Sequence, residues 1–137
     1  MHRESLQIET AGRGFHEITS RTGEIVARSG IRDGMCNAFI CHTSASLVIT
    51  ENADPDVLRD LETVVSGLAP DGDRRYVHTA EGPDDMSAHL RSVLTQTSII
   101  IPVADGALAL GTWQGLFLWE HRTASHARNV VVSVFSG

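Results

Sequence analysis

The chain is poor in features that define several large protein classes. It holds only two cysteines, Cys36 and Cys41, and carries a net charge of -6 over 137 residues. Five residues apart on one strand, the two thiols point to opposite faces, so we expect no disulfide and no thiolate metal site, but reduced and partly buried side chains. The negative charge argues against general nucleic-acid binding, which needs a basic face.

Long apolar runs and targeting signals are missing as well. No segment approaches the roughly 18 apolar residues that a membrane-spanning helix needs. The segment that starts at Met1 lacks the layout of a signal peptide. Internal repeats, low-complexity segments and linkers are also absent. We therefore expect a single domain over residues 1–137, cytoplasmic and not bound to a membrane.

Three stretches have helical signals. The first is Thr19–Ser29, and the second begins with Asp54 as N-cap and Pro55 at the first helical position. The third begins near Pro83, where a missing backbone N–H costs nothing. Its apolar residues recur at helical spacing and predict one buried face made of Met86, Leu90, Val93 and Leu94.

Strand patterns fill most of the remaining chain. They cover residues 6–10, 15–18, 35–43 with a continuation at 47–49, 98–103, 108–122 and 129–135. Pro102 suggests an edge or a strand end. With helices early and strands dominating the end, the predicted class is α+β, a largely antiparallel sheet or sandwich with two or three helices on one side.

Groups able to bind a metal or move a proton gather around the break at Gly82 and Pro83. They are His78, His89, Glu81, Asp84 and Asp85. Asp85 and His89 are four residues apart and hence neighbours on a helix. Simpler explanations are a solvated Asp85–His89 pair and acidic side chains that favour a helix N-terminus. We nevertheless expect the site at this helix start.

Two further histidines end apolar strands. His42 precedes Thr43-Ser44, and His121 follows the strand that ends at Glu120. Neutral imidazole is the commonest metal ligand, and zinc accepts three histidines plus water. His42, His78, His89 and His121 could supply such a site if the fold brings them together, although a strand histidine such as His42 is often a hydrogen-bonded core residue.

The run from Gly111 to Gly115 is unusual for a strand. Glycine weakens a strand unless backbone or ligand must approach closely. Trp113 would share a face with Trp119 and His121, where it would stack on a flat heterocycle or fill a core. Arg122 would meet a phosphate or remain an ordinary surface charge.

Four runs, in order and spacing, resemble the YjbQ-like family across nearly the whole chain. They are 42–46 (HTSAS), 51–57 (ENADPDV), 81–86 (EGPDDM) followed by Ala88-His89, and 110–115 (LGTWQG) followed by Glu120-His121-Arg122. The resemblance implies a compact α+β homotrimer, with shared histidines near a subunit boundary and often around a metal. One departure is Ser87, where the family usually has proline.

The resemblance also implies a secondary thiamine-phosphate synthase activity, which joins a pyrimidine-methyl diphosphate to a thiazole phosphate and releases diphosphate. The expected cofactor is a divalent metal, zinc or magnesium, and the expected partners are a small-molecule substrate, including phosphorylated ones, and two further copies of the chain. Three sets of residues follow. The metal ligands are His42, His78 and His89; the catalytic residues are Glu81, Asp84, Asp85, His121 and Arg122; the substrate-binding residues are Ser44, Trp113, Gln114 and Gly115.

Two other functions fit the same residues. One is a zinc hydrolase, in which three histidines hold a metal that activates water and Glu81 is the general base. The other is a trimeric module that binds a small ligand or metal without turnover. Zinc at one per subunit favours the hydrolase, and loosely held magnesium favours phosphate chemistry.

Overall fold

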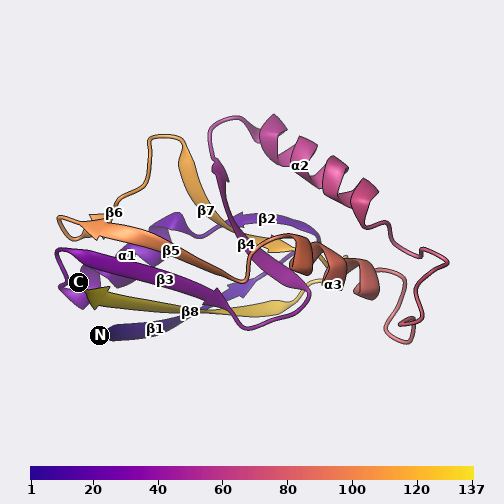
Figure 1. Cartoon of the computed structure of the whole chain (residues 1–137), viewed down its shortest axis with the longest axis horizontal. Helices are drawn as coiled ribbons and strands as arrows, with labels where there is room; N and C mark the ends of the chain where they lie inside the picture. The colour runs from indigo at the N-terminus through magenta and orange to yellow at the C-terminus, as the bar shows by residue number, and fades with distance from the viewer.

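Two antiparallel sheets form the body of the protein, and the computed structural model describes all 137 residues. The five-stranded sheet has the order β1 (His2–Glu9), β8 (Ala127–Ser136), β3 (Gly34–Ile40), β5 (Ser98–Ala104) and β6 (Ala107–Leu108). The three-stranded sheet has the order β2 (Gly14–Glu17), β7 (Gln114–Glu120) and β4 (Ala45–Glu51). Figure 1 shows the longer sheet running across the molecule, with both termini at the same end. The predicted α+β class with antiparallel sheets is confirmed.

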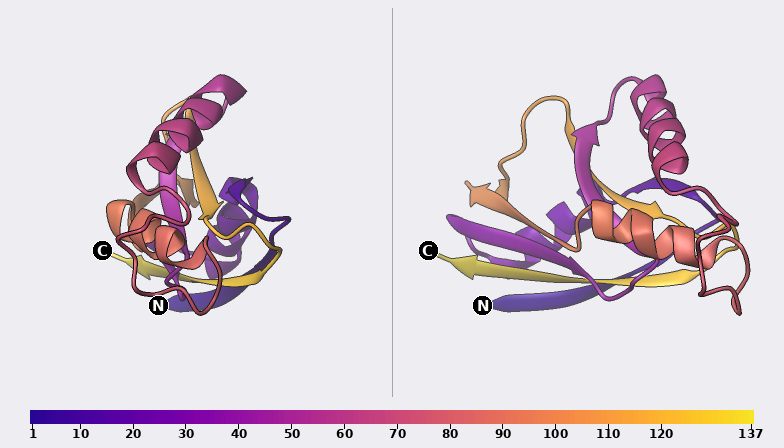
Figure 2. Two further views of the ribbon diagram at one scale, coloured as in Figure 1. Left: turned by 90° about the vertical axis from the view of Figure 1, so that its right-hand side faces the viewer. Right: turned by 45° about the vertical axis from the view of Figure 1, so that its right-hand side comes forward.

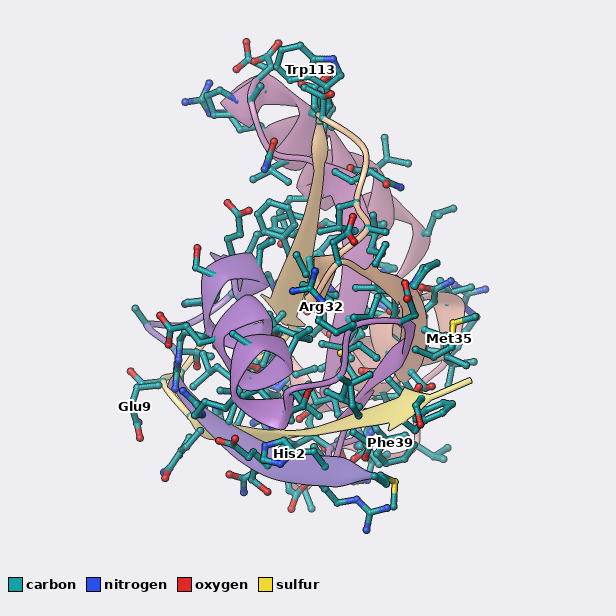
Figure 3. The ribbon with its side chains drawn as sticks, turned by 90° about the vertical axis from the view of Figure 1, so that its left-hand side faces the viewer. His2, Glu9, Arg32, Met35, Phe39 and Trp113 are labelled. Atoms are coloured by element: carbon teal, nitrogen blue, oxygen red, sulfur yellow. The ribbon has the colours of Figure 1, made fainter.

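Three helices accompany the sheets: α1 (Thr19–Ser29), α2 (Pro55–Leu68) and α3 (Asp85–Leu94). Helix α1 has the predicted bounds and buries Ile25 and Val26 completely. It lies on the side of the molecule opposite Met35 and Phe39 (Figure 3). The cap of α2 also forms as predicted, because the Asp54 side chain accepts a hydrogen bond from the backbone N of Asp56 at 2.9 Å. Helix α2 stands away from the sheets (Figure 1), and none of its residues is buried.

The apolar core lies where α1 and both sheets meet. Its 18 buried residues come from α1, six strands and the single residue Ile18. Strand β7 has buried side chains on both of its faces. Leu116 and Leu118 belong to the core, whereas Trp119 on the other face stacks on Phe15 with ring centroids 4.3 Å apart.

The chain leaves one sheet for the other between β3 and β4. The sequence pattern predicted a strand over 35–43 that continues at 47–49, and this is wrong, because β3 ends at Ile40 and β4 pairs with β7 in the other sheet. The connection carries His42, Thr43 and Ser44. Figure 1 shows that it passes close to α3, which matters for the site.

The predicted strand over residues 108–122 is also interrupted. Strand β6 ends at Leu108 and β7 begins at Gln114. Between them the Gln114 side chain accepts a hydrogen bond from the backbone N of Gly111 at 2.7 Å, which closes a turn. Trp113 is 63 % exposed at an outer tip of the molecule (Figure 3) and does not share a face with the buried Trp119 and His121.

Helix α3 buries a different face from the one that its apolar spacing predicts. Val93 is 81 % exposed and Leu94 58 %, whereas the buried residues are Asp85, Ser87, Ala88 and Arg91. The polar members of this face have partners from distant segments, described below. Charge pairing and hydrogen bonding therefore orient α3 more than its apolar stripe does.

The cysteines are both free, as expected. Cys36 is buried, and burial raises its pKa to about 11. Cys41 follows β3 and is exposed, which corrects the expectation that both thiols are partly buried. No helix has the length and the apolar character needed to cross a membrane.

Candidate metal centre

Two histidines and an aspartate converge at the start of α3. Nε2 of His78 lies 2.6 Å from Oδ2 of Asp85, and Nε2 of His89 lies 3.1 Å from the same oxygen. Each of the three residues offers one possible ligand atom, and these three atoms all lie within 4.8 Å of one another. Asp85 is almost completely buried, while the side chains of His78 and His89 are 42 % and 32 % exposed. The cluster is thus buried on the side of Asp85 and open to solvent on the side of the two histidines.

Local backbone geometry brings His78 to α3. Gly82 has φ 101°, a conformation that favours glycine, and its N–H donates to the Thr79 carbonyl at 3.2 Å. The N–H of Gly72 donates to the carbonyl of Pro83 at 2.9 Å, which closes the base of the loop. Figure 2 shows this loop between the end of α2 and the start of α3.

The connection between β3 and β4 fixes the second histidine. Nδ1 of His89 lies 3.0 Å from the carbonyl oxygen of Thr43, so this nitrogen carries the proton and donates it. The lone pair of a neutral His89 is then on Nε2 and faces the Asp85 carboxylate. In that form two acceptors face each other, and a cation between them would relieve the repulsion.

Arg122 holds both aspartates in place. Its Nε donates to Asp84 at 3.0 Å, one terminal nitrogen donates to Asp85 at 2.8 Å, and the other donates to the Glu81 carbonyl at 3.0 Å. Burial would raise the pKa of Asp84, but the Arg122 and Thr123 hydrogen bonds outweigh it and lower that pKa. For Asp85, burial is likewise outweighed by the hydrogen bond from His78 and by nearby positive charge, so its pKa is lowered too. Arg122 thus has two of five N–H groups left for a ligand.

Glu81 lies at the rim of the cluster. Its carboxylate is 3.6 Å from Nε2 of His78, and its side chain is 64 % exposed. This acidic group is therefore close to the cluster and free to move.

His42 is not a member of the cluster. Its Nε2 accepts a hydrogen bond from the backbone N of Asn129 at 2.9 Å, and its Nδ1 faces a nitrogen of Arg128 at 3.3 Å. Nε2 is thus taken by a donor within the chain, and Arg128 lies against the other ring nitrogen. The structure places Asp85, which was predicted to be catalytic, where the third histidine was expected.

His121 belongs to a separate buried network. Its Nδ1 accepts a hydrogen bond from Nε of Arg91 at 3.1 Å, so Nε2 bears the proton and donates to Oγ of Ser46 at 2.8 Å. Burial, and then the charge of Arg91, lower its pKa to about 2. A neutral, fully buried imidazole with both nitrogens paired has no contact with the cluster.

The residues predicted to bind substrate are spread over other regions. Ser44 is buried and accepts a hydrogen bond from Arg128 at 3.0 Å. A side chain at Gly115 would meet Glu17 at 2.7 Å, so packing within the chain accounts for this glycine. Neither Trp113, Gln114 nor Gly115 lines a cavity beside the cluster.

Sequence reasoning missed the buried ion pairs that hold these elements together. Arg91 pairs with Glu62 and lies over Trp119, with its guanidinium carbon 5.6 Å from the ring centroid. Arg128 and Glu120 form a second buried pair. The only local signal for Arg91 is its position on the same side of the helix as Asp84 and Ala88, which precede it by seven and three residues.

Two cavities flank the cluster. One has a volume of about 500 Å³, is lined by the end of β3 and the outer side of α3, and includes His42 and His89. The other has a volume of about 420 Å³, is largely polar and includes His78. The rings of His78 and His89 are 5.5 Å apart, so a ligand of moderate size at the cluster has access to both.

The fold and the cluster define a small α+β protein with an open histidine–aspartate site at a helix start. The family model described as UPF0047 protein YjbQ-like matches residues 4–137, and the chain belongs to this family. It is 53 % identical to a UPF0047 protein of Synechocystis sp., with 97 % of this chain and 90 % of that protein covered. It is 34 % identical to the UPF0047 protein YjbQ of Escherichia coli O157:H7, with 97 % and 96 % covered.

Solved structures agree with the family assignment. A YjbQ/UPF0047 family protein of Clostridium acetobutylicum, called uncharacterized in its description, superposes with a TM-score of 0.89 at 34 % identity, covering 96 % of this chain and 99 % of that one. A hypothetical protein of Aeropyrum pernix superposes with a TM-score of 0.90 at 25 % identity over 100 % of both chains. The predicted resemblance is therefore confirmed as membership.

Proposed function

We propose that the protein is an enzyme that binds a divalent metal through His78, Asp85 and His89. The supporting observation is that Nε2 of His89 faces the Asp85 carboxylate at 3.1 Å while Nδ1 faces the carbonyl oxygen of Thr43 at 3.0 Å. A cation between these acceptors removes their repulsion. The set also fits a metal chemically, since ligating histidines usually donate their other nitrogen to a carbonyl or carboxylate.

The reaction we propose is a group transfer of the thiamine-phosphate synthase type, joining a pyrimidine-methyl diphosphate to a thiazole phosphate with release of diphosphate. A bound divalent metal would supply positive charge for the departing diphosphate. Arg122 would keep Asp85 ionised and oriented. The more apolar cavity beside His89 would seat a heterocyclic ring, and the polar cavity beside His78 would take the phosphate end.

Metal binding and turnover are tested separately. Titration calorimetry with zinc and with magnesium should give one site per chain, and His89→Ala should weaken it by more than about 100-fold. His2→Ala, which changes a histidine in β1 that is not part of the cluster, is the matched control. Purified protein with both substrates and the bound metal should release thiamine phosphate. If the wild type binds neither metal, the proposed metal site is wrong. If the metal binds but no thiamine phosphate forms, the proposed reaction is wrong.

A zinc hydrolase is the second candidate, and the donor set itself favours it. Two histidines, one carboxylate and an open position are typical of catalytic zinc, and the Glu81 carboxylate, 3.6 Å from Nε2 of His78, would serve as the general base. Zinc held at one per chain, together with cleavage of an activated ester that Glu81→Gln abolishes, would favour this function. Tight ligand retention with no turnover would instead indicate a binding module.

We further propose that the chain acts as a homotrimer. The support is the uncovered apolar surface of α2, on which Val64 is 61 % and Leu68 66 % exposed. Beside it lies a largely apolar groove of about 650 Å³ between α2 and strands β4 and β5. Sedimentation velocity should give three times the chain mass of 14.8 kDa. Val64→Asp should reduce that mass, whereas Arg59→Asp on the same helix should not.

A further inference from the structure

The polar cavity beside His78 has features that the metal cluster does not use. Its eight lining residues include a single hydrophobic one, and its volume is about 420 Å³. They lie in the loop between α2 and α3 and include Arg74, Thr79 and Gly82. Because His78 belongs both to this wall and to the cluster, a ligand in the cavity is adjacent to the proposed metal.

Arg74 differs in its pairing from its neighbours. Arg75 pairs with Asp73 through a terminal nitrogen at 2.8 Å, and so neutralises the one acidic residue of the cavity wall. Arg13, which reaches the base of the same loop, pairs with Asp71 at 2.9 Å. Arg74 forms no ion pair, so its positive charge is uncompensated beside the cavity.

The loop also presents unused backbone donors. From Val77 to Glu81, no backbone N–H donates to a main-chain carbonyl. Of these residues, His78 and Thr79 line the cavity, and their N–H groups, the Thr79 hydroxyl and the Arg74 guanidinium are donors of the kind that bind phosphate oxygens.

We propose that this cavity is a phosphate subsite in which Arg74 and Thr79 bind a phosphate monoester or a diphosphate. This proposal rests on the proposed function, which supplies the neighbouring metal. It adds the side chains that would select a phosphorylated substrate. Glu81, Asp84 and Asp85 lie beyond His78 and repel an anion. Phosphate binding and metal binding should therefore strengthen each other, and to the same extent in both directions.

The test is titration calorimetry of the whole protein, with and without zinc. The probes are inorganic phosphate, inorganic diphosphate and a thiazole phosphate, which distinguish a free anion from an esterified one. Wild-type protein should bind diphosphate more tightly with zinc than without. Arg74→Gln should weaken the binding about tenfold, as expected for loss of one charge-assisted hydrogen bond. Thr79→Val should weaken it less.

Arg32→Gln is the control, since it removes a guanidinium that is 72 % exposed in a different region. Unchanged zinc affinity in Arg74→Gln shows that the loop is still folded. Equal losses for Arg74→Gln and Arg32→Gln, or no binding of any probe by zinc-loaded wild type, would overturn the proposal. If diphosphate binds through Arg74 but no thiamine phosphate forms, the subsite stands and the proposed reaction falls.

Discussion

The buried pair Arg91–Glu62 should be the most sensitive point of the fold outside the apolar core. The Arg91 guanidinium is fully buried, and it donates to Glu62, to Oγ of Ser66 at 2.9 Å and to His121. The other Glu62 oxygen accepts from Trp119 Nε1 at 3.0 Å. Since α2 buries no residue of its own, Glu62 is its principal attachment to α3 and β7.

The substitution Glu62→Gln keeps the size of the side chain and removes its charge. Breaking a buried ion pair costs about 3–5 kcal/mol because one charge stays buried without compensation. Glu62 is 27 % exposed, and glutamine can still accept one hydrogen bond, so we expect the lower end, about 3 kcal/mol. Urea unfolding followed by tryptophan fluorescence, at fixed protein concentration, measures this change.

The control is Arg59→Gln on the same helix. Arg59 pairs with Asp56, and both side chains are more than 60 % exposed, at 73 % and 66 %. An exposed pair of this kind contributes about 0.3–0.5 kcal/mol. If Glu62→Gln changes the free energy of unfolding no more than Arg59→Gln does, the idea that this pair attaches α2 is wrong.

Three further predictions concern single residues. The pKa of His121 is about 2 in the fold and 6.5 ordinarily, so the unfolded chain binds one more proton and stability falls below pH 6.5. His121→Gln should reduce this slope by about 1.4 kcal/mol per pH unit near pH 5, measured as urea midpoints between pH 7 and 5; an unchanged slope contradicts the burial argument. Ellman's reagent should titrate one thiol in the native protein, Cys41, and two in denaturant; Cys41→Ser should leave no fast thiol, and rapid reaction of Cys36 would contradict its burial. Ser87→Ala removes the hydrogen bond to Asp71 at the base of the His78 loop. It should lower the free energy of unfolding by about 1 kcal/mol and weaken zinc binding, whereas Ser92→Ala should leave zinc binding unchanged.

Signals that act within a few residues predicted their elements well. The bounds of α1 follow from its spacing, and α2 begins at the residue that the Asp54-Pro55 pair indicates. The break between β3 and β4 was not predictable in this way. Ser44 lies in the connection that leads from one sheet to the other, and nothing in the local pattern says that the strands on either side belong to different sheets.

Local signals also explain which part of the candidate site was predicted and which part was not. His78, Asp85 and His89 lie within one short segment, and local spacing placed them together. His42 and His121 both follow apolar strands, but the layer into which a strand end points depends on partners far along the chain. Arg91 donates to His121 in the interior, while the backbone N–H of Asn129 donates to Nε2 of His42 and Arg128 lies against its Nδ1.

The inner face of α3 links the fold to the proposed chemistry. An apolar face would have bound the helix more simply, but packing alone leaves a helix free to rotate or slide by small amounts. On the actual face Asp85 is fixed by Arg122, Ser87 by Asp71 and Arg91 by Glu62, and each of these bonds has a direction. A helix fixed in this way holds His89 at a constant angle to Asp85. The same charges protect the site in mild acid, because the pKa values of Asp84 and Asp85 are lowered and both carboxylates stay ionised. Only below the ordinary range of an aspartate would their protonation release Arg122 and with it the orientation of the cluster.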